Sequence, residues 1–576
     1  MDRVLYAPRT LPPLRPDVSE DTTDYDQWVR QREADRCSGL ASPPPSSDAL
    51  HVVMVVDGAP PAETVGSLQS LAAQTSSHWT LSVALHRPWQ PDVSALLAVS
   101  GIRERVDLEQ CDPGATYQDL LRSGLSASRG QNVALIHPGD VWAPDAVALL
   151  STALPVDGVV YADEDAIDGT GHHVDPRLKP DISPEFLLHG DYVGRPLALS
   201  AGVVQRLPPG AAGVPEACEH DLALRACEVA ESVRHVPEVL CHRRTDNVPI
   251  PTDAPGGTDH VVAALHRLGT VAEVLPGHGA GTFRIVRSVR SVRTASIVIP
   301  LRDEPRFLRA CIDSIERTKG VVMADYVLID NGSVQPETMT LLERLAARPN
   351  VQVLRDDRPF NWAALNNTGA ELATGDVLVF LNNDIEALSP GWLDALCAQA
   401  ERPDVGAVGA RLLYPDHRLQ HCGVVIGLGG AAGHLFVGLD ESAPGYFGMA
   451  VTTRECSGVT GACLATLRET FEAHGRFDES LGIDLNDIDY CLRLQRSGLH
   501  VLYEPVAELV HHESPSRGTA GDVSDIVHFI DRWKTSILDG DPYLSPHLTR
   551  KDASCALRSP SEEEWWRRWY TGLADV

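Results

Sequence analysis

The hydrophobic pattern of this chain consists of short apolar runs that end abruptly at polar side chains. The clearest run is 377–381, which follows Gly375 and ends at Asn382-Asn383-Asp384. Four to eight apolar residues between turn signals are typical of a buried parallel strand. Ligands bind beyond the carboxyl ends of such strands, so Asp384 lies where a ligand would bind, and its carboxylate suits Mg²⁺ or Mn²⁺. An ordinary turn explains the same polar residues, and the run alone does not decide between the two.

A helical pattern further along the chain carries a second set of polar residues. Gly498 ends this pattern, whose repeating members are Ile488, Cys491, Leu492 and Gln495. We therefore expect Asn486 or Asp487 at the N-cap, where free amide groups and the helix dipole favour a carboxylate. Capping alone would explain Asp487. Ordinary surface or core histidines would also explain His511 and His512, which close another apolar run.

These residues belong to a longer series of short motifs. In order they are the strand 296–300, the strand ending in Asp330-Asn331-Gly332-Ser333, the segment 361–367, Asn382-Asn383-Asp384, the segments 460–463 and 477–479, Asn486-Asp487-Ile488-Asp489, the segment 511–518 and the closing segment 541–548. Each motif is modest alone. In this order and spacing they closely resemble family 2 glycosyltransferases of the GT-A fold, an α/β fold with a Rossmann-like sheet.

The resemblance implies a nucleotide site. Asp330 and Asp303 are expected to contact the base or ribose, since a strand-end carboxylate accepts hydrogen bonds from imide and hydroxyl groups. Asn361, Asn366 and Asn382 are expected to complete the site.

The resemblance also implies a metal and a base. Asp384 and His511, with the carbonyl oxygen of Asn382, are expected to hold Mn²⁺ or Mg²⁺ on the diphosphate, where the ion neutralises charge on the leaving group. Asp487 is expected to take the proton of an acceptor hydroxyl as that oxygen attacks the anomeric carbon opposite the nucleotide, which inverts the anomeric configuration. Secondary candidates for the site are Asn486, Asp489, His512 and Arg517.

Two positions depart from the motifs of the family. Asn382 stands where the first Asp of the DXD motif is usual, and Asn486 stands where a Glu usually precedes the base. With one carboxylate fewer at the metal, we expect the site to bind its ion weakly.

The N-terminal half carries a divergent version of the same series. Its segments are 50–56, 161–165, 178–188, 219–225 and 235–243. They resemble another family 2 domain, of the type found in O-antigen and other surface-polysaccharide assembly. We therefore expect two tandem GT-A domains, which form an internal repeat.

The first of these domains lacks residues that donor chemistry needs. His86 stands at the strand end where the family is acidic, and His137 and Gly139 replace carboxylates of the metal motif, leaving Asp140. We expect a catalytically weak or inactive domain that serves as a scaffold or acceptor platform. The three acids 163–165 fit a solvated turn.

Length and composition agree with two domains. The 576 residues suffice for two cores with linkers. We expect a flexible N-terminal arm (1–48), a degenerate GT-A-like domain (49–246), a connector (247–293), a catalytic GT-A domain (294–550) and a C-terminal tail (551–576).

The net charge limits the classes of binding partner, and the cysteine pattern indicates the cellular compartment. A net charge of −30 disfavours nucleic acid and anionic lipid as partners. No run is long and apolar enough to span a membrane, and the start of the chain lacks the apolar core of a secretory signal. The 12 cysteines contain no C-x-x-C pair and suit a reducing cytoplasm. We expect a cytoplasmic protein, at most peripheral at the inner face of the cell membrane.

Three functions compete. The resemblance favours an inverting, metal-dependent transferase that moves a sugar from a nucleotide-diphosphate donor to a glycan or lipid-linked acceptor. A non-catalytic scaffold or regulatory subunit stays open because of the two asparagine substitutions. A sugar-phosphate nucleotidyltransferase is least favoured, because such enzymes need a glycine-rich loop after the first strand, and the segment 300–305 has no glycine.

Overall fold

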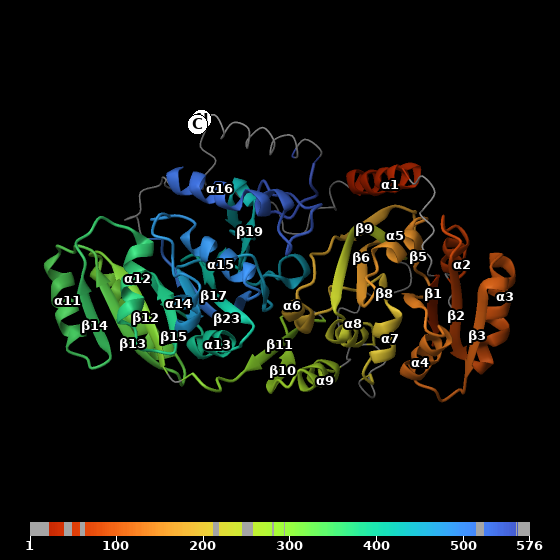
Figure 1. Cartoon of the computed structure of the whole chain (residues 1–576), viewed down its shortest axis with the longest axis horizontal. Coiled ribbons are helices and arrows are strands. Elements are labelled where there is room, and N and C mark those ends of the chain that lie inside the picture. Colours follow the sequence, from red (N-terminus) through yellow and green to blue (C-terminus); the bar gives the residue numbers. More distant parts are fainter. Residues whose placement is uncertain are drawn as a thin grey trace. The chain divides into compact units, whose positions relative to one another are not determined.

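The structure is a computed structural model that describes residues 22–39, 49–57, 64–210, 218–244, 257–278, 281–292, 294–513, 523–559 and 562. The chain forms two compact units (Figure 1). The N-terminal unit takes in most residues up to 270, and the C-terminal unit takes in residues from 284 onward.

The C-terminal unit is built on a ten-stranded sheet. Its main path runs in the order β14 (Val351–Arg355), β13 (Met323–Asp330), β12 (Thr294–Leu301), β15 (Val377–Leu381), β22 (Cys463–Leu467), β17 (Val405–Leu413), β23 (His500–His511) and β16 (Ile385–Ala387). Strands β18 (Leu419–His421) and β21 (Arg454–Glu455) pair with β17 and β23, and β19 (Val424–Ile426) forms a separate hairpin with β20 (Ala432–His434).

Helices connect these strands. They are α10 (Pro305–Thr318), α11 (Pro336–Ala346), α12 (Trp362–Leu372), α13 (Trp392–Ala400), α14 (Arg468–Ala473), α15 (Asn486–Arg496) and α16 (Val523–Asp539), with 3₁₀ turns at Leu428–Gly430 and Tyr446–Gly448. The apolar run 377–381 forms β15 with every side chain buried, as expected for a strand covered on both faces.

The N-terminal unit is built on a nine-stranded sheet. Its main path is β3 (Val106–Cys111), β2 (Trp79–His86), β1 (Leu50–Val56), β4 (Asn132–Ile136), β8 (Leu197–Leu199), β6 (Gly158–Ile167), β9 (Ser232–Arg244) and β5 (Val141–Trp142), and β7 (His173–Arg177) pairs with β6. Its helices are α1 (Thr22–Gly39), α2 (Thr64–Ala72), α3 (Gln90–Ser100), α4 (Tyr117–Ala127), α5 (Ala146–Ala153), α6 (Pro184–His189), α7 (Ala201–Arg206), α8 (Cys218–Val229) and α9 (Asp259–Arg267), with 3₁₀ turns at Arg87–Trp89 and Arg103–Arg105.

The two sheets have the same strand order and the same pairing directions. In each, the first four strands of the path are parallel, the fifth is antiparallel to both neighbours, the sixth and seventh are parallel, and the last is antiparallel. Strand β4 therefore corresponds to β15, β2 to β13 and β9 to β23. The expected internal repeat of two tandem α/β domains is confirmed.

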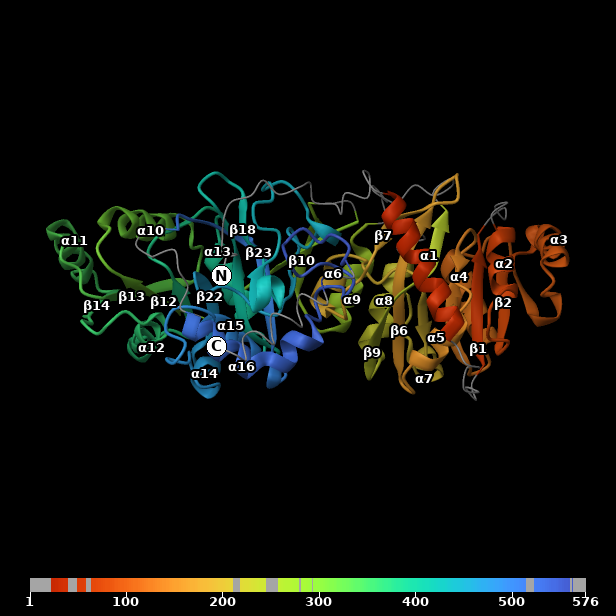
Figure 2. The same cartoon turned by 90° about the horizontal axis from the view of Figure 1, so that it is seen from above.

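Two predicted linker segments contain regular structure. Within the arm expected to be flexible, residues 22–39 form α1, which lies beside β7 (Figure 2). Sequence did not indicate this because the helix is held by ion pairs rather than by an apolar stripe; Arg36, for example, binds Asp145 at 2.8 Å. The expected connector contains α9 and a hairpin of β10 (Ala272–Pro276) and β11 (Phe283–Arg287).

Candidate functional site

Asp384 and His511 lie at or just beyond the carboxyl ends of two strands. Asp384 follows β15 and directly precedes β16, which pairs with the end of β23 so that Ile385 lies opposite His511. This pairing brings the two polar residues together. The Asp384 Oδ1 and His511 Nε2 atoms are 3.3 Å apart, and both residues are buried.

Asn382 lies between two aromatic nitrogens. Its side-chain Oδ1 accepts a hydrogen bond from the Trp362 indole at 3.4 Å, and its Nδ2 lies 3.3 Å from His511 Nε2. The carbonyl oxygen that we expected to hold the ion therefore accepts from an indole in this structure.

Asp487 is held by backbone amides at the start of α15. Its Oδ2 accepts from Gly461 N at 2.6 Å and its Oδ1 from Ile488 N at 2.8 Å, and the side chain stays partly exposed. The prediction of Asn486 or Asp487 as N-cap is wrong: Leu485, with a φ of 63°, is the N-cap, and Asp487 lies within the first turn. The dipole of the helix still favours its charge there.

Gly461 allows the backbone to pack closely against Trp362. A Cβ atom at this position would lie 2.4 Å from the Trp362 ring, far inside contact distance. The missing side chain lets the 460–463 segment approach Trp362 while its backbone N–H holds Asp487.

Asp330 and Asp303 lie at the neighbouring strand ends. The Asp330 carboxylate binds Arg355 at 2.7 Å and accepts from Ser333 N at 2.9 Å. Asp303 accepts from two backbone amides of the 332–335 turn, each at 2.8 Å. A cavity of about 630 Å³ opens beside Asp330, lined also by Arg355 and by Val334, Met339 and Leu342.

The predicted asparagines of α12 support the backbone. Asn361 caps the helix by accepting from Ala364 N at 2.8 Å, and it donates to the Glu479 carbonyl at 2.8 Å. Asn366 is fully buried and donates to the Trp362 carbonyl at 2.9 Å.

The secondary candidates mostly make hydrogen bonds or ion pairs with neighbouring residues. Asp489 is buried and accepts from Arg493, Arg532 and Trp533, each at 2.9 Å, so it fastens α15 to α16. Asn486 donates to the Leu481 carbonyl at 3.1 Å. His512 lies 2.8 Å from a Glu386 carboxylate oxygen, and Arg517 falls outside the described residues.

Sequence reasoning missed three polar residues beside His511. Gln420 Oε1 lies 2.8 Å from His511 Nδ1, and His421 and His434 contact each other through their Nδ1 atoms at 2.9 Å. Burial lowers the pKa of His434 to about 4 and that of His421 well below its ordinary value. No local motif marks them, because β18 brings Gln420 to the site by pairing with β17.

The corresponding site of the N-terminal unit contains an arginine. Asp140 precedes β5 as Asp384 precedes β16, and Glu219 stands two residues before an Asp–Arg i,i+4 pair of α8, as Asp487 does in α15. Arg195 binds Asp140 at 2.9 Å and Glu219 through two nitrogens at 2.9 and 2.5 Å. Burial alone would raise the pKa of Glu219, but Arg195 and His137 lower it to about 2.

The acids 163–165 are buried in β6, so the prediction of a solvated turn is wrong. Glu164 binds Arg177 at 3.0 Å, and Asp163 binds His235 at 2.9 Å. Partners from later in the chain thus compensate their charge.

The third acid belongs to a buried triad that could hold a metal ion, made of Asp165, His173 and His242. The Asp165 oxygens lie 2.9 Å from His173 Nδ1 and 2.6 Å from His242 Nδ1, which are hydrogen-bond lengths. Tyr25 of α1 donates to the same carboxylate at 3.0 Å. Burial alone would lower the pKa of His242, but Asp165 and Glu33 raise it to about 9. Through Tyr25, the triad also ties α1 to β6.

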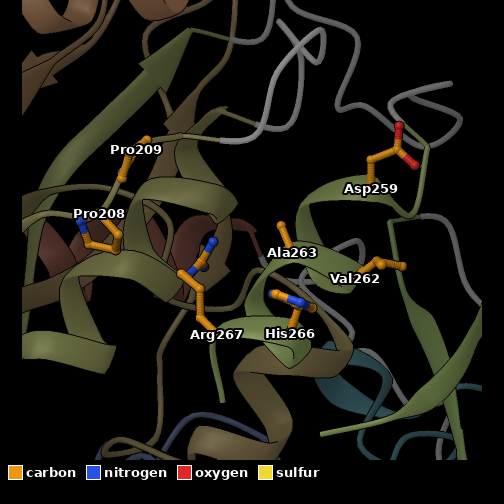
Figure 3. A pocket seen from close by; sticks show the side chains of 7 residues that line it. All are labelled: Pro208, Pro209, Asp259, Val262, Ala263, His266 and Arg267. Carbon is orange, nitrogen blue, oxygen red and sulfur yellow. The ribbon is translucent and has the colours of Figure 1, made fainter. Parts of the chain in front are cut away.

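A separate surface pocket of about 570 Å³ lies beside α9 (Figure 3). It is lined by Pro208, Pro209, Asp259, Val262, Ala263, His266 and Arg267. Arg267 is already bound to Glu228 by two hydrogen bonds, at 2.6 and 2.7 Å. None of the predicted site residues lines it.

The sequence of the chain is similar to glycosyltransferases and to a protein of O-antigen biosynthesis. Residues 296–473 match Glycosyl transferase family 2. The chain is similar to the O-antigen biosynthesis protein RfbC of Myxococcus xanthus, at 33% identity over 97% of this chain and 45% of that protein. It is 32% identical to the uncharacterized protein y4gI of Sinorhizobium fredii, over 92% of this chain and 61% of that protein. An N-acetylglucosaminyl-diphospho-decaprenol L-rhamnosyltransferase of Mycobacterium tuberculosis is 28% identical over 37% of this chain and 73% of its own length.

The chain thus spans about half the length of the first two relatives. In the parts of the chain that the structure describes, no helix combines the length and apolarity needed to cross a membrane.

Proposed function

We propose, on the premise that residues 296–473 form a glycosyl transferase family 2 domain, that the C-terminal unit moves a sugar from a nucleotide-diphosphate donor to a hydroxyl group of a glycan or lipid-linked acceptor. The convergence of Asp384 and His511, with 3.3 Å between a carboxylate oxygen and an imidazole nitrogen, carries the proposal. The two residues lie far apart in the sequence, and the β16–β23 pairing brings them to one point.

Asp384 and His511 would hold a divalent cation, Mn²⁺ or Mg²⁺. A carboxylate oxygen is a hard ligand for both ions, and neutral imidazole is the commonest nitrogen ligand of protein-bound metals. When bound, the cation would neutralise charge that develops on the diphosphate leaving group. Asp330 and Asp303 would contact the nucleoside, and Arg355 would move from Asp330 or share it with the nucleotide.

Asp487 would be the general base. Hydrogen bonds from Gly461 N and Ile488 N favour its ionised form and fix its position, while its partial exposure leaves it reachable by an acceptor. Attack by the acceptor oxygen opposite the departing nucleotide would invert the anomeric configuration, with the hydroxyl proton passing to the Asp487 carboxylate.

The N-terminal unit would serve as a scaffold or acceptor platform. Arg195 supplies a fixed positive charge between Asp140 and Glu219, which correspond to the proposed metal ligand and base. The protein would act in surface-polysaccharide assembly, in the cytoplasm or at the inner face of the cell membrane. The name of the Myxococcus xanthus relative supports that setting.

Thermal unfolding of the full chain with UDP, dTDP or GDP, each with and without Mn²⁺, tests the proposal. A ligand that binds only the folded state raises the unfolding temperature. We expect one nucleotide to stabilise the protein only when Mn²⁺ is present, and Asp384→Ala to lose that effect. Asp416→Ala is the matched control, because Asp416 is an exposed carboxylate of the same unit that pairs with Arg418.

The same experiment contains the outcome that would contradict a transferase. A wild-type chain that responds to no nucleotide in the presence of Mn²⁺ would favour the scaffold or regulatory function. Transferase activity that survives Asp384→Ala would place the working site elsewhere in the chain.

A further inference from the structure

We propose that Asp330 and Arg355 form a base-reading pair for the donor nucleotide. The carboxylate would accept from a ring N–H of the base, and the guanidinium would donate to the carbonyl oxygen beside that N–H. Uracil, thymine and guanine carry such an edge, whereas cytosine and adenine do not. The inference rests on the proposed function, to which it adds Arg355 as a residue that determines donor specificity.

The sheet brings the two side chains of the base-reading pair together. Asp330 is the last residue of β13 and Arg355 is the last residue of β14, and the parallel pairing of these strands places the two opposite each other. The Asp330 Oδ2 atom accepts from Arg355 Nη1 at 2.7 Å. An acceptor and a donor therefore lie side by side on the wall of the cavity of about 630 Å³.

Three acceptors fix the plane of the Arg355 guanidinium. Besides binding Asp330, its Nη1 donates to the Ser333 carbonyl at 2.8 Å, and its Nε donates to Asp357 at 2.7 Å. A guanidinium is a rigid planar fork, so these contacts also fix the direction of its remaining N–H groups. A lysine at this position would keep the charge but would not present a second N–H in a fixed plane.

Both members of the pair keep hydrogen-bonding capacity for a ligand. Arg355 Nη2 makes no hydrogen bond with any residue that the structure describes. Gly332 leaves the space beside this nitrogen open, since even a Cβ atom at that position would lie 3.9 Å from it. A carboxylate has about four acceptor sites, and that of Asp330 accepts from Arg355 and from Ser333 N, which leaves capacity for a base N–H.

The order of acceptor and donor selects among the bases. Cytosine would turn its N3 lone pair toward the carboxylate and its amino group toward the guanidinium, so both contacts would be repulsive. Adenine would do the same with N1 and its amino group. The Asp330 side chain is only 3% exposed, so water cannot readily separate such mismatched groups. A site that hydrogen-bonds its ligand rejects a mismatch more strongly than an apolar pocket does.

At the corresponding strand ends of the N-terminal unit, both members of the pair are replaced. Strands β2 and β3 correspond to β13 and β14, and their last residues, His86 and Cys111, lie opposite each other in the same way. Neither residue offers a carboxylate or a guanidinium. The inference therefore agrees with the proposal that the C-terminal unit binds the nucleotide.

Isothermal titration of the full chain with UDP, dTDP, GDP, CDP and ADP, in EDTA and in Mn²⁺, tests the inference. All five ligands share the diphosphate, so the ratio of their affinities measures base reading. Arg355→Lys keeps the charge and removes the planar fork, and Asp330→Asn replaces one acceptor oxygen by a donor. Arg418→Lys is the matched control, because Arg418 is an arginine of the same unit that pairs with the exposed Asp416.

We expect the wild type and Arg418→Lys to favour at least one of UDP, dTDP and GDP over CDP and ADP by about 10- to 100-fold. Arg355→Lys should lose most of this preference. Asp330→Asn should raise the affinity for CDP relative to UDP, because its amide can donate to cytosine N3. An unchanged preference in Arg355→Lys, or an equal weakening of all five nucleotides, would overturn the base-reading pair.

Failure of the proposed function gives a different result. Base discrimination in EDTA that Mn²⁺ does not strengthen would uphold the base-reading pair and overturn the metal site. Binding of all five nucleotides with equal affinity that depends on Mn²⁺ would uphold the donor site and overturn the pair. Absence of binding by every nucleotide would overturn both.

Discussion

If Asp487 is the proposed base, its substitution should separate chemistry from binding in the C-terminal unit. Asp487→Asn keeps the size of the side chain and one of the two oxygens that accept from the Gly461 and Ile488 amides, but it removes the proposed base. We expect kcat to fall about 10²- to 10⁴-fold, because a positioned general base contributes about that much. Nucleotide stabilisation should stay as in the wild type. Loss of nucleotide binding together with activity would mean that Asp487 acts on the donor.

Gly461 is a second residue whose change has a calculable effect. Gly461→Ala would put a methyl group 2.4 Å from the buried Trp362 ring. Overpacking of this kind costs about 1–3 kcal/mol of unfolding free energy, measured by urea denaturation. Gly114→Ala is the control, because its new Cβ would meet nothing within 4 Å. Equal stability of the two variants would show that the Trp362 ring moves aside at no cost.

At the residue scale, the sequence predicted the polar residues at the strand ends, but not the residues that form hydrogen bonds and ion pairs with them. Asp384 and His511 were visible because each ends an apolar run, and runs of that length predict strands. Gln420 was not visible, since only the pairing of β18 with β17 brings it to His511. The acids of β6 were misplaced for the same reason: Arg177 and His235, which compensate them, lie outside the local window.

At the element scale, docking of α1 should depend on pH. The folded-state pKa of His242 is raised from 6.5 to about 9, so its protonated form stabilises the fold. That stabilisation is fully present below the unfolded value and is lost as the pH rises through about 9. At 1.36 kcal/mol per pKa unit the full effect is about 3 kcal/mol.

Urea unfolding across this pH range checks the prediction for α1. Wild-type stability should fall as the pH rises toward 9 and beyond, and His242→Gln should flatten that fall. Glu33→Gln should give an intermediate slope, because Glu33 lies 3.8 Å from His242 Nε2 on the side opposite Asp165. Equal pH dependence in all three proteins would show that His242 is neutral in the folded chain.

At the scale of the whole molecule, the chain should bind one nucleotide rather than two. The two sheets share one topology, but Arg195 fills the N-terminal site and His86 stands at the end of β2, where β13 ends in Asp330. Isothermal titration with the stabilising nucleotide and Mn²⁺ should give a stoichiometry of about one per chain. A stoichiometry of two would contradict the proposal that the N-terminal unit is inactive.

The paired arginine also bears on how this molecule could change over generations. Arg195 touches both Asp140 and Glu219, so replacing either acid alone leaves a partly buried guanidinium short of a partner, and replacing Arg195 alone leaves two carboxylates facing each other. Each of these single substitutions is expected to lower the stability of the fold, whereas replacing all three residues together would leave no unpaired charge. The arginine therefore acts as a ratchet: single substitutions lower stability, so selection for stability alone would retain the ion pairs that occupy this site.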